Sequence, residues 1–440
     1  MYVILSIFAD SKNRDTFMLK KTNAWLWIPT LYFASGLPYH AITSISDIMY
    51  KDMGISNGEV AFYTSFLLIP WTIKPLWSPF VEMISTRRKW TIISQGLLAL
   101  CFALIALFIP SDSFLILTFI GFLLGAFVSS THDIALDGFY ILALPQEQQS
   151  FFSGIRNTFY RIATVFSSGI LVMLAYKFGY ILGSDAMAWS ATFATTALIM
   201  GVLFLYHRKS MPKPESDVAQ TPQSIKEIFY SFGDIIKTYF QKPRIWATLL
   251  FLLLFRFPEA QLGKIGKFFL LDDTGVGGLA LDKGDVGFLN GVVGVAGLIA
   301  GGILGGICIS RKGLKYWLWP MVVAISLPDA VYVYMSMVQP ESLTIIGSCI
   351  FVEQLGYGFG FTAYTLYMIY IAQGKYPTAH FAISTAFMSL GMMLPGMISG
   401  KIQEWLGYEY FFIWVMLCTA VTFTVSAVVK IDPGFGKREK

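Results

Sequence analysis

Twelve long apolar runs dominate this chain and restrict the folds that it can adopt. A helix needs about 20 predominantly apolar residues to cross a membrane, because it rises about 1.5 Å per residue through a hydrocarbon core about 30 Å thick. Charged residues make up 13% of the 440 residues, against about 25% in a soluble domain, and hydrophobic residues make up 55%. We therefore predict an all-α polytopic membrane protein with twelve transmembrane helices, at residues 25–46, 59–81, 90–110, 114–140, 150–176, 186–206, 245–271, 285–309, 315–338, 343–370, 378–401 and 409–430.

A long polar stretch at 207–244 divides these runs into six and six. Inside it, SIKEIFYSFGDIIKTYF has the periodicity of an amphipathic helix, which we expect to lie along the membrane surface. The predicted organisation is a cytoplasmic leader at 1–21, a six-helix bundle at 22–206, a cytoplasmic linker at 207–244, a second six-helix bundle at 245–430 and a cytoplasmic tail at 431–440.

Basic residues gather at alternate ends of the runs and predict the orientation of the chain. Cytoplasmic loops carry an excess of Lys and Arg, so both termini should be cytoplasmic. The loop LDDTGVGGLALDKGD is acidic and is expected on the outer side. The basic groups lie at 20–21, 87–89, 207–244, 311–315 and 437–440.

The two halves of the sequence echo each other. KPLWSPFVEMISTRRKW joins spans two and three, and GGILGGICISRKGLKYW joins spans eight and nine. Each combines a helix end, a tight basic turn and a tryptophan that opens the next helix, and such repeats are typical of transporters of the major facilitator type. Neither phosphate-binding glycine motif is present and the four cysteines lack CxxC spacing, so we expect no cofactor, no metal and no nucleic-acid partner.

Four stretches carry a family resemblance: YFASGLPYHAI (32–42), LLIPWTIKPLWSPFVE (67–82), STHDIALDGF (130–139) and YRIATVFSSG (160–169). They resemble the AmpG muropeptide permease family of the major facilitator superfamily, to which the acetyl-coenzyme A transporters are a related branch. The resemblance covers residues 22–430 and implies a proton-driven importer of anhydro-muropeptides or related amino-sugar saccharides. Two positions depart from the family, with His132 where Gln is usual and Glu82 where Asp is usual.

Asp133 and Asp137, one helical turn apart near the end of span four, are the first candidate site residues. An ionisable group inside a membrane costs about 2.5–3.5 kcal/mol on insertion scales, so such groups mark candidate sites. Either one of them carries a proton, or the pair is a structural acidic element that holds an inner gate. A metal site is not expected, because adjacent helix residues point in different directions. Further candidates for the gate are His132, Arg87, Arg88 and Arg311.

Arg156 and Arg161 lie early in span five, close to that acidic pair. One of them could bind a carboxylate of the substrate, because the guanidinium fork matches a carboxylate. The alternative is an ion pair with Asp133 or Asp137, because opposite charges inside a membrane usually meet.

Arg256 and Glu259 flank Pro258 in LFRFPEAQLGK. Residues three apart share a helix face, and proline breaks the helix. Transporters place substrates and coupling ions at broken helices near the middle of the membrane. We expect Glu259 to couple protons and Arg256 to pair with it or to anchor the substrate; the alternative is an internal ion pair at a kink.

Glu353 in span ten adds a second buried carboxylate and a further proton-coupling candidate. Aromatic side chains nearby offer hydroxyls and flat faces suited to sugars, although packing is the alternative for each of them. The expected substrate-binding lining is Tyr32, Tyr39, Asn290, Tyr357 and Tyr364.

These features predict a proton symporter of the bacterial inner membrane that imports a muropeptide-like or amino-sugar saccharide by alternating access, and not an enzyme. The expected partners are the saccharide, protons and the bilayer, and the expected oligomeric state is a monomer. Transport of acetyl-coenzyme A or of a plain oligosaccharide is the alternative within this class. A membrane-embedded acyl or glycosyl transferase that uses His132 and Asp133 is the alternative from another class.

Overall fold

The computed structural model describes residues 23–437 except 79–80, 82–83, 145, 216 and 219–224. The predicted leader at 1–21, part of the linker and the last three residues of the tail lie outside the described residues, as does the departure at position 82. Every regular element in the described part is a helix.

The N-terminal half forms six spans. Its elements are η1 (Ala24–Leu26), α2 (Ile28–His40), η2 (Ala41–Ile45), α3 (Ser46–Asp52), α4 (Asn57–Phe66), α5 (Ile69–Ile73), η3 (Lys74–Leu76), α7 (Arg87–Phe108), α8 (Phe114–Ala143), α9 (Gln146–Val165), η4 (Phe166–Leu171), α10 (Val172–Leu182) and α11 (Asp185–Ser210). The first span is α2–η2–α3, the second is α4–α5–η3, and the fifth is α9–η4–α10.

The C-terminal half repeats this plan after the linker helix. Its elements are α12 (Ile225–Phe240), α13 (Ile245–Leu254), α14 (Phe257–Leu271), η5 (Thr274–Val276), α15 (Lys283–Phe288), η6 (Leu289–Gly294), α16 (Val295–Lys312), α17 (Leu314–Ser326), η7 (Leu327–Asp329), α18 (Ala330–Val338), α19 (Leu343–Ala372) and α20 (Pro377–Val428).

Within the described residues, nine helices are long and apolar enough to cross a membrane. The last of them lies within α20, which holds the eleventh and twelfth predicted spans and turns at Gly407, where φ is +75°. The first two predicted spans, divided into shorter pieces, are not among these nine. The nine helices contain ten predicted spans and these pieces supply the other two, so the twelve-helix prediction is confirmed.

The breaks within the spans have local causes. Pro258 lies in the first turn of α14. Arg256, the residue before α14, has a non-helical backbone with φ −102°, so the seventh span is divided into α13 and α14. Three helices begin at a capping residue whose side-chain oxygen accepts a hydrogen bond from the backbone N–H three residues later. Ser56 caps α4, Thr86 caps α7 and Ser184 caps α11.

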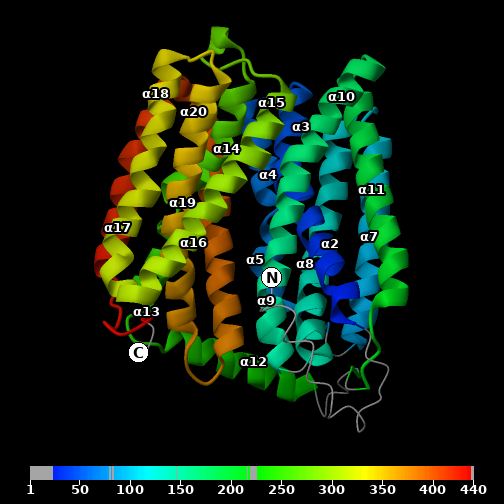
Figure 1. Ribbon diagram of the computed structural model, residues 1–440, viewed down its shortest axis with the longest axis vertical. Coiled ribbons are helices and arrows are strands. Elements are labelled where there is room, and N and C mark those ends of the chain that lie inside the picture. Colours follow the sequence, from blue (N-terminus) through cyan, green and yellow to red (C-terminus); the bar gives the residue numbers. More distant parts are fainter. Residues whose placement is uncertain are drawn as a thin grey trace, which may run out of the picture.

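The linker helix α12 is attached to the beginning of α20. The hydroxyls of Tyr239 and Ser384 lie 2.9 Å apart. Asp234 accepts hydrogen bonds from Lys375 Nζ at 2.9 Å and from Tyr376 at 2.8 Å, and these two bonds lower the pKa of the Asp234 carboxyl. In Figure 1, α12 lies across the bottom of the bundle. We call this side the linker face and the opposite side the far face.

The two halves contact each other mainly toward the far face. There α10 packs on α15, α3 on α14, and α4 on the second half's α20; α10 and α15 lie near the top of Figure 1. One close approach is between η4 and η6, where a Cβ atom on Gly291 would lie only 2.2 Å from Gly169 N. Two glycines at this crossing therefore allow the backbones of the fifth and eighth spans to touch.

Replacing Gly291 by alanine should lower the free energy of unfolding by about 1–3 kcal/mol, because backbone atoms would have to move to admit the methyl group. The matched control is Gly306→Ala in α16, where an added Cβ meets no atom within 4 Å. That variant should be neutral or gain about 0.5–1 kcal/mol from helix propensity. Thermal unfolding of the purified protein in detergent measures both, and equal melting temperatures would contradict the close crossing of η4 and η6.

Candidate functional site

Asp133 lies on α8 in the linker-face part of the first half and bonds to two neighbouring spans. Ser35 Oγ on α2 donates to its Oδ1 at 2.7 Å, and Trp71 Nε1 on α5 donates to its Oδ2 at 3.1 Å. Both carboxylate oxygens are therefore hydrogen-bonded within the N-terminal half.

Asp137 pairs with the fifth span, as one of the two interpretations of Arg156 expects. Arg156 Nη2 lies 3.5 Å from Asp137 Oδ1, and the side chains are 31% and 56% exposed. The guanidinium also lies over the rings of Tyr32, at 4.8 Å, and Tyr140, at 5.1 Å. Tyr32 donates to the same carboxylate at 3.4 Å. Ion pairs with this much exposure are weak, so this contact can open at little energetic cost.

His132 faces away from the two aspartates. Its Nε2 lies 3.1 Å from Gln95 Nε2, and the other end of that amide lies 3.0 Å from His207 Nδ1. His207 Nε2 lies 2.9 Å from the Thr30 hydroxyl. His132 is fully buried, so the residue that departs from the family pattern belongs to a hydrogen-bonded chain between α2, α7, α8 and α11. Sequence reasoning did not single out Gln95, His207 or Thr30.

Arg256 and Glu259 lie at the break between α13 and α14, where the sequence predicts a break. Arg256 Nη2 is 3.8 Å from Glu259 Oε1, and each residue is 8% exposed. Arg256 also donates to the Tyr357 hydroxyl. Its guanidinium lies over the rings of Tyr357, at 5.2 Å, and Phe361, at 4.8 Å. The broken helix thus presents a charged pair that is held by aromatic side chains of α19.

Two further carboxylates are buried near this pair. Glu353 on α19 is 4% exposed, and its two carboxylate oxygens accept hydrogen bonds from the side-chain amide nitrogen of Gln354, at 2.9 and 3.2 Å. Asp329, at the break between α17 and α18, is 3% exposed and interacts electrostatically with Glu353 and Glu259. Within the described part of the chain, Glu259 Oε2 and Asp329 Oδ2 have no hydrogen-bond partner. Asp329 was not predicted, although an aspartate after proline in the apolar stretch AISLPDAVY is the signal that identifies it.

The remaining predicted lining residues have different environments. Tyr39 packs edge-on against Trp71, with ring centroids 5.0 Å apart. Tyr364 is buried, donates to Leu252 O at 2.5 Å and stacks on Phe255, so it packs within the second half. Asn290 lies on η6, and its buried Nδ2 has no partner among the described residues. Arg161 lines a cavity of about 550 Å³ between α9 and α16.

The predicted gate arginines lie on the linker face. The backbone N–H groups of Arg87 and Arg88 each donate to Asp217 at 2.9 Å, so the start of α7 binds the linker. The Arg88 side chain donates to two backbone carbonyls at the end of α11, those of Arg208 and Met211. Arg87 also lies against Gly138 of α8, and Arg311 is exposed near the end of α16.

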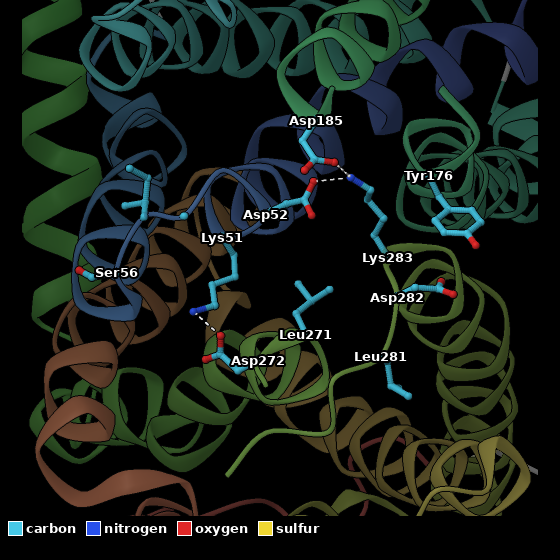
Figure 2. A pocket seen from close by; sticks show the side chains of 12 residues that line it. Lys51, Asp52, Ser56, Tyr176, Asp185, Leu271, Asp272, Leu281, Asp282 and Lys283 are labelled. Carbon is cyan, nitrogen blue, oxygen red and sulfur yellow. Dashed lines mark hydrogen bonds and ion pairs between the residues drawn. The ribbon is translucent and has the colours of Figure 1, made fainter. Parts of the chain in front are cut away.

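Ion pairs join the two halves toward the far face, and sequence reasoning did not identify them. We call this group the latch. Lys51 Nζ is 2.5 Å from Asp272 Oδ1, and Lys283 bridges Asp52, at 2.6 Å, and Asp185. Figure 2 shows these side chains converging from both halves around a cavity of about 540 Å³. Deeper in the bundle, the latch continues as Lys264–Asp47, at 2.7 Å, and Lys267–Asp47, at 2.9 Å.

Hydrogen bonds from uncharged donors reinforce the latch. Asn57 Nδ2 at the start of α4 donates to Gln403 at 2.7 Å and to Asp272 at 3.1 Å. The backbone N–H of Gly58 donates to Glu404 at 2.6 Å. The structure is therefore closed across the far face by contacts between residues from opposite halves.

Comparison with known proteins identifies the architecture. The sequence pattern of the Major Facilitator Superfamily matches residues 30–400. The chain belongs to this superfamily. As a Major Facilitator Superfamily member it is an integral membrane transporter of a small molecule, and not the membrane-embedded transferase of the alternative prediction.

Named relatives within the superfamily confirm the resemblance seen in the motifs. Putative transporter AmpG 4 of Rickettsia conorii is 26% identical over 401 residues, which cover 88% of this chain and 92% of that protein. The anhydromuropeptide permease of Escherichia coli K12 is 25% identical over 391 residues, which cover 87% of this chain and 75% of that protein.

Solved structures of the superfamily share the fold at lower identity. The D-xylose-proton symporter superposes with a TM-score of 0.71 at 12% identity, covering 94% of this chain and 99% of that one. The nucleoside transporter NupG superposes with a TM-score of 0.68 at 16% identity, covering 93% and 100%. These likenesses concern the arrangement of the helices.

Removing the cation that two latch carboxylates share should open the far face. In Lys283→Gln, Asp52 and Asp185 lose their shared partner, and a loss of about 1–3 kcal/mol shifts a two-state equilibrium roughly 5–150-fold. The readout is the rate at which a membrane-impermeant maleimide modifies Leu281→Cys in the wall of the latch cavity, with the four native cysteines replaced. Lys375→Gln breaks an ion pair on the linker face and should leave the rate unchanged. An unchanged rate in Lys283→Gln would show that these pairs do not hold the far face closed.

Proposed function

We propose that this transporter imports a muropeptide-like or amino-sugar saccharide into the cytoplasm of a bacterium, driven by protons. The observation that carries the proposal is the buried charge cluster at the broken seventh span, in which Glu259, Glu353 and Asp329 accompany Arg256. The relatives named AmpG and anhydromuropeptide permease support the choice of saccharide.

The cluster supports proton coupling because its charges do not balance. Arg256 is within ion-pair distance of Glu259, whereas Glu353 and Asp329 add two buried carboxylates whose charges interact with Glu259. Keeping unpaired carboxylates ionised in the membrane interior is costly, so protons are the natural counter-charges. Glu259 is the coupling group in this proposal because it is the carboxylate that pairs with Arg256. A proton on Glu259 frees Arg256 to bind another acceptor, such as a substrate oxygen. Glu353 and Asp329 adjust the charge around it.

In the proposed import, the linker face lies toward the cytoplasm. The basic residues gather on the linker face, and the positive-inside rule supports a cytoplasmic position for that face and for both termini. The far face, closed by the latch, then faces the outside. In this proposal the structure represents the state that exchanges substrate with the cytoplasm, and rocking of the two halves would expose the site to the other side.

Aromatic side chains offer surfaces for a sugar. The Arg256 guanidinium lies over the rings of Tyr357 and Phe361 of the second half, and it also interacts electrostatically with Tyr39 of the first half. Flat faces and hydroxyl groups of this kind suit the alternating apolar and polar edges of a sugar ring. Asp137 and Arg156 form a separate charged element on the cytoplasmic side in this orientation, where we place the inner gate.

Uptake into proteoliposomes tests the proposed function. The panel contains a labelled anhydro-muropeptide, a neutral disaccharide and acetyl-coenzyme A, each measured with and without an inward proton gradient. We expect accumulation of the anhydro-muropeptide that depends on the gradient. Gradient-independent uptake would remove proton coupling, and uptake of acetyl-coenzyme A or of the neutral disaccharide alone would replace the proposed substrate.

Glu259→Gln should abolish accumulation against a gradient while it retains exchange of labelled for unlabelled substrate. The amide keeps the shape and the hydrogen-bonding capacity of the side chain but cannot carry the proton. The control is Glu341→Gln, in an exposed loop between α18 and α19, which should behave like the wild type. Full accumulation with a normal pH dependence in Glu259→Gln would assign the coupling to another group.

A further inference from the structure

Lys264 and Lys267 of α14 reach the same buried carboxylate of the opposite half. Lys264 Nζ lies 2.7 Å from Asp47 Oδ1, and Lys267 Nζ lies 2.9 Å from Asp47 Oδ2. Hydroxyls complete the group, with Thr64 at 2.9 Å from Lys264 and Ser44 at 3.0 Å from Lys267. Both oxygens of Asp47 are therefore occupied, each by a different lysine.

The charges of this group do not cancel. Asp47 is fully buried and supplies one negative charge, whereas the two ammonium groups supply two positive charges. Each ammonium has three N–H donors, and the contacts above use two of them. An excess positive charge in a membrane interior is costly unless an anion compensates for it. The group is therefore suited to accept one more negatively charged oxygen.

The two lysines remain accessible from inside the protein. Their side chains keep 11% and 19% of their surface, although Asp47 between them has none. Gly263, which precedes Lys264, is exposed, and a Cβ atom there would lie 3.8 Å from Glu259 Oε1. Open space thus lies along α14 beside the charged pair at the helix break. Lys267 is eight residues from Glu259, about 12 Å along the helix at 1.5 Å per residue, a separation that one extended saccharide can span.

We propose that Lys264 and Lys267 form a binding site for a carboxylate of the transported molecule, which binds their free N–H donors as a second anion and competes with Asp47 for the two lysines. This inference rests on the proposed function, and it narrows the substrate class to saccharides that carry a carboxylate. Asp47 belongs to the first half and the lysines to the second, so this competition weakens a contact that joins the halves. A ligand that competes for a contact present in one state favours the other state. Binding of an acidic substrate is thereby linked to opening of the far face.

Binding to the purified full chain in detergent tests the inference with two probes, an anhydro-muropeptide with free carboxylates and the same molecule with its carboxylates converted to amides. The wild type should prefer the acid form. Lys267→Gln and Lys264→Gln should each bind the acid form about tenfold more weakly, the effect of losing a charge-assisted hydrogen bond, and should bind the amide form as the wild type does. Lys267→Arg, which keeps the charge, should retain the preference. Lys51→Gln is the matched control, because it removes a latch lysine that pairs with Asp272 at the rim, and it should not change the ratio of the two affinities.

The outcomes separate the inference from the function on which it rests. If the wild type binds both forms equally, or if the lysine variants weaken both forms by the same factor, the carboxylate site is wrong while saccharide transport stands. If the wild type binds neither form, the proposed function fails and the inference fails with it. Size-exclusion profiles matching the wild type show that a weakened variant is folded, and an unchanged acid preference in both glutamine variants overturns the proposal.

Discussion

Charged side chains inside a membrane need partners, and this constraint organises the whole structure. Each such group costs about 2.5–3.5 kcal/mol on insertion scales, and the described interior meets that cost mainly by pairing charges between different helices. Asp47 lies between Lys264 and Lys267, and Lys283 lies between Asp52 and Asp185. Most of these partners come from opposite halves, so the same pairs that make the charges tolerable also hold the far face closed.

The helix break at Pro258 concentrates the remaining charges. An unbroken seventh helix would pair all of its backbone hydrogen-bonding groups internally. The break instead leaves Arg256 and Glu259 as a buried charged pair in the interior. Asp329 lies at a second break, between α17 and α18, and approaches the same region. Breaks in two spans thus place polar groups where unbroken helices would present apolar side chains, which is the arrangement expected of a substrate or coupling site.

Sequence reasoning located many of these residues but only some of their partners. The pairing of Arg156 with Asp137 and the break at Arg256 could be anticipated, because helical spacing and short turns bring those groups together. Lys264 and Lys267 were missed although both interrupt an apolar run, because their partner Asp47 is more than 200 residues away and depends on how the halves meet. His132 was read together with Asp133, yet the rotation of α8 turns it toward Gln95. Tyr364 was expected to line the pathway, and it packs against Phe255.

The sequence by itself determined the membrane class, the number of spans, their division into two halves and the places where proline interrupts a helix. These depend on the length and composition of short segments, which hydropathy measures directly. Only the tertiary structure decided which charges meet, which face is closed and which histidines are buried. Those outcomes depend on the rotation of each helix about its axis and on the approach of two halves far apart in the chain, and a local pattern does not contain that information.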